Sequence, residues 1–269
     1  MARKAFFIKS LPKFSKRSKF VLSTVILTIG LLIAYLLGPV SEAQTITILA
    51  LLSFLLTLFC LREELQGIKW LIVVLLPVIF TIACGLFYFL LPARWLTRLI
   101  MLVLFAVGFY ATLLAQNIFL VSSLRSIKLL HAARTIGFLL SVVSAFGLYA
   151  VLFSLHTYLP VVVGVVAIVS FALIVPIIWS VLLGDSLGKK ELLFVGVLTL
   201  ALTELGTFIT FWPVSVTFAA IFLAGNFYTL VGVSQHWLEN SLFRRVLWEF
   251  VWVAVILSVI LFFTTSWGG

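Results

Sequence analysis

Long apolar runs separated by short polar breaks form the dominant pattern of this sequence. Most runs are about 17 to 25 residues long, which is the length that an α-helix needs to cross the hydrocarbon core of a bilayer. The pattern predicts nine membrane-spanning helices, at residues 20–38, 45–61, 70–91, 99–123, 135–156, 161–183, 191–212, 214–235 and 246–265.

The fold class follows from the solvent that these runs need. Of all residues, 64% are hydrophobic and 10% are charged, whereas soluble domains carry about a quarter charged residues. Each span must satisfy its own backbone hydrogen bonds in lipid, and the runs are continuously apolar rather than alternating, so helices are favoured over a β-barrel. We expect an all-α, polytopic transmembrane helical bundle, with a basic tail at residues 1–19 and a single transmembrane domain at residues 20–269.

The basic residues predict how the chain is threaded. With nine spans, all of the 18 lysines and arginines except Arg94 and Arg98 lie on the same side of the membrane as the N-terminus. Cytoplasmic loops carry such an excess, so we expect the N-terminus inside, the C-terminus outside, and a multi-pass protein of the cytoplasmic (inner) membrane. The net charge of +10 then follows from topology and gives no reason to expect nucleic-acid binding. The later inner loops are expected to expose Arg125, Lys128, Arg134, Arg244 and Arg245.

The N-terminal tail has three open interpretations. It combines many basic residues with several large apolar ones, so it fits a solvated tail that only sets orientation. It equally fits a segment that lies on anionic lipids at the inner leaflet. The small-residue site at Ser41, Glu42 and Ala43 also leaves open a cleaved signal peptide, although the preceding apolar core is long for one.

The familiar catalytic and cofactor-binding patterns are missing from the sequence. Asp185 is its single aspartate, which excludes paired-aspartate proteolysis and metal-dependent prenyl or phosphatidyl transfer. No zinc-protease, nucleophile-elbow, P-loop or dinucleotide motif occurs, and Cys60 and Cys84 both lie in apolar runs. We therefore expect no enzyme activity, no catalytic residue, no cofactor and no metal ion.

The histidines give no catalytic signal either. His131, His156 and His236 fall near the ends of predicted spans, where an imidazole is typically a hydrogen-bonding group at the membrane interface. The segments REEL (62–65) and HWLEN (236–240) contain glutamates and a histidine, as CAAX-type intramembrane proteases do. That family has an arginine where Ile68 stands in this chain, so the match is rejected.

Glu204 is the one formally charged side chain well inside a predicted span. It lies about 20 Å from the inner surface, in the outer half of a hydrocarbon core about 30 Å thick. A side chain this short cannot reach water from that depth. Desolvation disfavours a charged carboxyl, and no Lys or Arg lies at a comparable depth. We expect Glu204 to be mostly protonated and hydrogen-bonded within the bundle.

The expected partners of Glu204 lie on its own span and on the next one. Thr203 and Thr207 belong to a polar stripe on the same span, and the following span carries Asn226 and Tyr228 in the segment GNFYT. Antiparallel neighbours would place Asn226 one helical turn deeper than Glu204, so Asn226 is the partner that we expect. Two interpretations compete for this polar group: a hydrogen-bonded contact that joins helices, and a protonatable transport site.

Three segments resemble a known group of proteins: AQNIFLVSSLRSIKLLHAARTIGFLLS (115–141), TELGTFITFWPVSVTF (203–218) and HWLENSLFRRVLWEF (236–250). They are similar to a family of uncharacterised multi-span proteins of candidate-phyla bacteria of the Patescibacteria type. That family has no assigned activity, so the resemblance supplies no functional residue. It implies the cytoplasmic membrane of a small bacterium.

The sequence therefore predicts an integral membrane protein without catalysis of its own. The expected role is a structural or assembly component that contacts the lipid bilayer, other membrane proteins or anionic lipids; the oligomeric state is open. The alternative is a small transporter or channel with a protonatable site at Glu204, which requires a water-filled cavity reaching that residue. The structural role requires a closed core around the carboxyl, and a carboxyl directed at acyl chains without a partner would contradict it.

Overall fold

The computed structural model describes residues 15–36, 42–62, 69–91, 94–122, 129–184 and 187–265. This part of the chain is all-helical, and each of its nine helices is long and apolar enough to cross a membrane, which confirms the predicted helical bundle. The helices are α1 (Lys16–Leu36), α2 (Glu42–Leu61), α3 (Lys69–Leu90), α4 (Trp95–Ser122), α5 (Leu130–Ser154), α6 (Leu159–Leu182), α7 (Lys189–Thr210), α8 (Val216–Leu238) and α9 (Arg244–Phe263).

Several helices begin earlier than the predicted spans. α4 begins at Trp95 rather than at residue 99, and α5 begins at Leu130 rather than at residue 135. Hydropathy marks only the part of a helix that lies in hydrocarbon, whereas backbone hydrogen bonding extends the helix into the polar interface. As a result Arg134, which was predicted in an inner loop, lies in the second turn of α5. Arg244 and Arg245 likewise form the start of α9.

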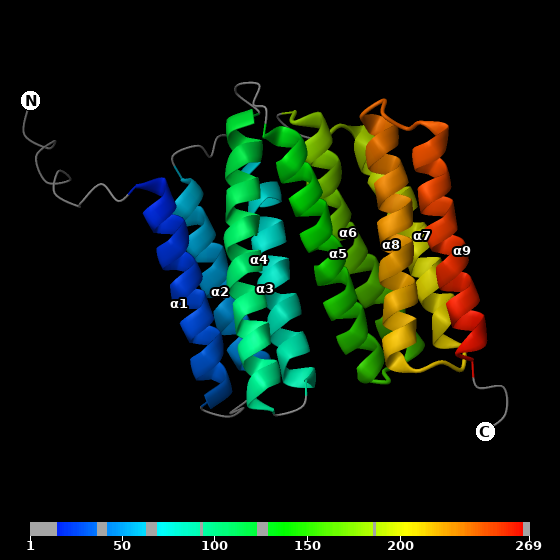
Figure 1. The fold of residues 1–269 in the computed structure, drawn as a ribbon, viewed down its shortest axis with the longest axis horizontal. Coiled ribbons are helices and arrows are strands. Elements are labelled where there is room, and N and C mark those ends of the chain that lie inside the picture. Colours follow the sequence, from blue (N-terminus) through cyan, green and yellow to red (C-terminus); the bar gives the residue numbers. More distant parts are fainter. Residues whose placement is uncertain are drawn as a thin grey trace, which may run out of the picture.

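Consecutive helices run in opposite directions and pack side by side, with α1 to α4 on one side of the bundle and α5 to α9 on the other (Figure 1). α3 and α4 both contact α5 and so join the two sides. α5 also packs along α8, which is far from it in the sequence, and α9 packs against α8. We term the end of the bundle where the odd-numbered helices begin the N face, and the opposite end the C face.

Basic residues divide between the two faces as the threading predicts. The described basic residues of the C face are Arg94 and Arg98. The cytoplasmic position of the N face stays a prediction from this asymmetry. Two of the predicted basic residues, Arg125 and Lys128, lie outside the described residues. The basic residues at the N face, by contrast, are Lys16, Arg17, Lys19, Arg62, Lys69, Arg134, Lys189, Lys190, Arg244 and Arg245.

The core is built from aromatic and aliphatic side chains of most helices. Trp179, Tyr149 and Phe109 are among its largest fully buried side chains. The Tyr149 hydroxyl and the Ser170 hydroxyl lie 2.8 Å apart and join α5 to α6, so the polar end of this buried tyrosine has a partner. Large apolar side chains also cover the outer surfaces of the helices, as expected for surfaces that face acyl chains.

Candidate functional site

Glu204 lies on the outward surface of α7. Gly206, two residues later, faces the core, because a Cβ atom there would meet Val166 of α6 and Leu223 of α8. Two residues correspond to about 200° around a helix, so Glu204 points away from these neighbours. It is exposed, and it belongs to a row of exposed residues spaced three or four apart, which we term the α7 stripe: Leu193, Val197, Leu200, Glu204, Phe208 and Phe211.

The structure does not form the predicted hydrogen bond between Glu204 and Asn226. The side-chain amide of Asn226 instead donates to the carbonyl oxygen of Phe222 in its own helix, at 2.8 Å. Within the part of the chain that the structure describes, Glu204 has neither a hydrogen-bond nor an ion-pair partner. The expectation that Asn226 holds this carboxyl inside the bundle is wrong, and so is the expectation that a structural role places the carboxyl in a closed core of its own chain. The depth of Glu204 along α7 was predictable from the sequence, but the direction in which packing turns it was not.

The threonines next to Glu204 are also satisfied without it. The Thr203 hydroxyl donates to the carbonyl oxygen of Thr199, and the Thr207 hydroxyl donates to that of Thr203, each at 2.8 Å. Such bonds to the preceding turn are the usual way in which a helix in lipid satisfies a hydroxyl. The predicted polar stripe therefore exists on α7, but it is closed within its own helix.

Tyr228 belongs to a different part of the molecule. Its ring packs between Phe138 of α5 and Phe250 of α9, with centroid distances of 5.5 Å and 5.2 Å. Tyr228 thus helps to line a cavity near the N face. The predicted intramembrane polar residues are not one site: Glu204 faces outward, and Tyr228 faces this cavity.

The cavity is a cleft of about 330 Å³ between the N-face ends of α5 and α8 and the start of α9. Its α5 wall consists of residues three or four apart, which share one face of the helix. We term it the α5–α8–α9 cleft. Its lining residues are His131, Arg134, Thr135, Phe138, Leu139, Tyr228, Gly232, Gln235, His236, Glu239 and Phe250.

Arg134 ties three helices together at one end of this cleft. Its Nη1 atom lies 3.1 Å from Oε1 of Glu239, which follows α8, and both side chains are largely buried. Nε and Nη2 each donate at 3.0 Å, to the carbonyl oxygens of Ser180 and Val181 in the last turn of α6. These carbonyls have no partner within their helix, so the guanidinium caps α6. Arg134, predicted as an exposed loop charge, is instead a largely buried structural cation.

Other polar side chains of the cleft make fewer hydrogen bonds within the protein than Arg134 does. Nδ1 of His236 lies 3.0 Å from the Ser241 hydroxyl, and the same ring packs against Phe250 at 5.8 Å between centroids. The imidazole of His131 and the amide of Gln235 have no side-chain hydrogen bond to any described residue. His131 and His236 were predicted to be interfacial hydrogen-bonding groups, and Gln235 was not predicted as a site residue. Their spacing in each helix was visible, but the pairing of α5 with α8 was not.

The remaining predicted basic residues are exposed at the start of α9. The Nε atom of Arg245 lies 3.8 Å from Oε1 of Glu249, and the two side chains are 93% and 68% exposed. Exposed pairs of this kind contribute little to stability. Arg244 is also exposed, so both arginines are positioned to meet anionic groups at the N face.

Gln116 of α4 is a buried polar side chain whose amide nitrogen and oxygen both lack a partner among the described residues. It lines a small cavity of about 10 Å³ together with Arg134, Ser141 and Ser180. That volume is at the lower limit of the space that one water molecule needs. Gln116 is therefore one of the least well satisfied groups in the described core.

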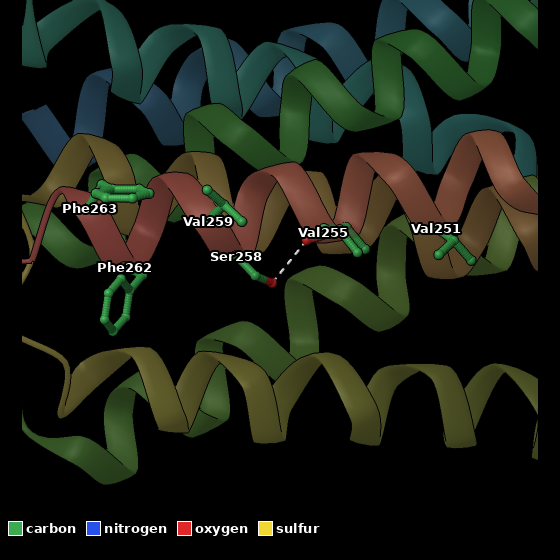
Figure 2. A pocket seen from close by; sticks show the side chains of 7 residues that line it. Val251, Val255, Ser258, Val259, Phe262 and Phe263 are labelled. Carbon is green, nitrogen blue, oxygen red and sulfur yellow. Dashed lines mark hydrogen bonds between the residues drawn. The ribbon is translucent and has the colours of Figure 1, made fainter.

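Two further cavities are apolar. A crevice of about 390 Å³ between α3, α4 and α5 is lined by side chains such as Phe80, Met101 and Phe146. A shallow groove of about 460 Å³ follows the outer face of α9, where Ser258 donates to the carbonyl oxygen of Ala254 (Figure 2). None of these four cavities is lined by Glu204.

A family model described as a protein of unknown function, DUF5656, matches residues 41–264. The chain belongs to this family. The match spans α2 to α9 and so contains both the α7 stripe and the α5–α8–α9 cleft. The predicted resemblance to an uncharacterised family of multi-span proteins is confirmed, and the match gives no indication of candidate-phyla bacteria. No curated protein and no solved structure matches the chain.

Proposed function

We propose that the protein is a non-catalytic assembly component of its membrane, which associates with a second copy of itself through the α7 stripe. The observation that carries this proposal is the outward position of Glu204 without a partner in the described part of its own chain. Acidic residues within transmembrane helices nearly always face other protein groups or water. In this protein the chain itself supplies neither, so the missing contact has to come from another molecule.

The depth of Glu204 in the membrane favours this contact. Glu204 precedes the last residue of α7, Thr210, by six positions, which places it about 9 Å from the C-face end of the helix. Transfer of an acidic side chain to the centre of a bilayer costs about 2.5–3.5 kcal/mol on insertion scales, which is an upper limit for Glu204 because it lies nearer the C face. A protonated carboxyl still has a donor and an acceptor that acyl chains cannot satisfy. Either protonation state therefore favours a polar partner.

A second copy meets this requirement through symmetry. Two copies thread the membrane in the same direction, so a twofold axis along the bilayer normal relates them. Residues near that axis face their own counterparts at equal depth, and Glu204 would meet Glu204. An unrelated partner would need its own polar group at the same depth. Flanking side chains, Leu200 and Phe208, lie one turn to either side and are 61% and 47% exposed, which gives the contact an apolar surround.

The absence of catalysis and of transport is part of the proposal. The sequence lacks the motifs of the main enzyme classes, and none of the four cavities described above reaches Glu204. A transport role for this carboxyl would require an aqueous path to it. An interhelical contact requires only an exposed face, which α7 provides.

Disulfide cross-linking across the proposed twofold axis tests the association. Each variant with one introduced cysteine, Leu200→Cys or Phe208→Cys, is oxidised in membranes. We expect each variant to form a dimer joined by a disulfide between the two introduced cysteines. Cys60 and Cys84 are buried and should contribute little background. The matched control is Leu55→Cys on α2, which is 60% exposed but lies on the other side of the bundle (Figure 1). Equal cross-linking at all three positions, or none, would overturn the proposed interface.

Substitution of Glu204 then tests the role of the carboxyl. Polar contacts between membrane helices contribute about 1–2 kcal/mol in model peptides, so Glu204→Leu should lower the dimerisation constant about 5- to 30-fold. Glu204→Gln keeps a donor and an acceptor and should stay close to the wild-type value. Single-molecule counting of labelled chains in lipid vesicles measures both. An unchanged dimer fraction in Glu204→Leu would contradict the proposal.

A further inference from the structure

The α5–α8–α9 cleft changes from polar to aromatic along its depth. At the N face it presents His131, Gln235 and His236, and further into the membrane it ends on the rings of Phe138 and Tyr228. From His131 to Leu139 along α5, the cleft extends over about 12 Å. That distance covers the headgroup region and the first part of the acyl chains, so the cleft has the polarity of a lipid molecule in the adjoining leaflet.

Several hydrogen-bond donors of the cleft are available for a ligand. The His131 imidazole, the Gln235 amide and the Tyr228 hydroxyl have no side-chain partner among the described residues. The Arg134 guanidinium uses three of its five N–H groups in the bonds to Glu239 and α6. A convergent set of donors fits a group rich in acceptor oxygens.

The charge of the cleft agrees with an anionic ligand. Among the described residues that line it, the one carboxylate is Glu239, which lies 3.1 Å from Arg134, so its charge is balanced within the protein. All described basic residues except Arg94 and Arg98 lie at the N face, and Arg244 and Arg245 are among them. The field at this face therefore attracts anions.

The open volume of the cleft depends on a glycine. A Cβ atom at Gly232 would lie within 2.7 Å of the Phe250 ring and 3.3 Å from the Phe138 ring. Gly232 thus lets both rings pack against α8 and form the apolar floor. The resulting volume of about 330 Å³ lies at the small end of the range for ligand sites, about 300–1,000 Å³.

We infer that this cleft binds an anionic, phosphate-bearing headgroup, with its oxygens at His131, Gln235 and His236 and any attached chain over the aromatic floor. The group could arrive on an anionic phospholipid or on a soluble phosphate ester. The apolar floor at Phe138, Tyr228 and Phe250 favours the lipid.

Thermal unfolding of the full chain in neutral detergent tests this inference. Phosphatidylglycerol is added in one arm, phosphatidylcholine in a second and glycerol phosphate in a third. We expect phosphatidylglycerol to raise the melting temperature more than phosphatidylcholine does. An equal or greater effect of glycerol phosphate would identify a soluble ligand at the same site. No shift in any arm, or equal shifts with the two lipids, would overturn the inference.

Single-residue variants test whether the rise in melting temperature caused by phosphatidylglycerol comes from binding in the α5–α8–α9 cleft. Gln235→Leu and Gly232→Ala should each remove at least half of the shift caused by phosphatidylglycerol, by loss of a donor and by displacement of Phe250. Arg245→Met, on the same face but outside the cleft, should keep it. Loss of the shift in Arg245→Met with retention in Gln235→Leu would mean that lipid binds to surface charge, and would overturn the site. Native mass spectrometry of bound phosphatidylglycerol checks the same variants if Gly232→Ala itself lowers stability.

Discussion

Replacement of Arg134 by methionine is expected to be among the most destabilising single changes at the N face. The substitution removes the ion pair with Glu239 and the two bonds to the last turn of α6. The two side chains of the pair are only 11% and 14% exposed. Removal of one partner from a buried pair costs about 3–5 kcal/mol, because the other charge stays buried without compensation. Arg134→Met should therefore lower the free energy of unfolding by about that amount.

A matched variant separates this effect from a general loss of basic charge. Arg245 also pairs with a glutamate, but at 3.8 Å and with side chains that are 93% and 68% exposed. Arg245→Met should cost at most about 0.5 kcal/mol. The double variant Arg134→Met/Glu239→Met should cost less than Arg134→Met alone, since it leaves no unpaired buried charge.

Reversible unfolding in mixed detergent micelles measures all three free energies under one condition. Comparable losses in Arg134→Met and Arg245→Met would refute the assignment of Arg134 as a buried tie between α5, α6 and the end of α8. A double variant less stable than Arg134→Met would show instead that Glu239 is stabilised by something other than Arg134.

Three further substitutions concern the interior and the surface of the bundle, and the same micelle assay measures their effects on the free energy of unfolding. Gln116→Leu removes a buried amide without partners and should raise the free energy of unfolding by about 1 kcal/mol; a clear loss would show that the small neighbouring cavity satisfies the amide. Gly108→Ala should destabilise by about 1–3 kcal/mol, because the new Cβ atom would collide with the Phe80 ring. Gly196→Ala, where a Cβ meets nothing within 4 Å, should stabilise α7 by about 0.5–1 kcal/mol; equal effects of the two alanines would contradict this reasoning.

The candidate sites were only partly predictable from the sequence. Glu204 was correctly singled out as unusual, because a charged residue inside an apolar run is visible without a structure, whereas Arg134 was predicted only as one of several inner-loop basic residues. The environments of both residues were predicted wrongly: Glu204 has no hydrogen bond to Asn226, and Arg134 is largely buried rather than exposed. His131 and Gln235 were not predicted as site residues, since the cleft arises only when α5 and α8 pack together.

The sequence by itself determined the solvent, the number of helices and the separation of basic residues between the two faces. These properties depend on position along one chain: the length of an apolar run, its breaks and the charges beside it. Tertiary structure decided the rotation of each helix about its axis and the partners of its side chains. In a soluble protein, hydrophobic periodicity shows which face is buried. In a bilayer the lipid-facing and core-facing surfaces are both apolar, so only packing between helices turned Glu204 outward and Tyr228 into the cleft.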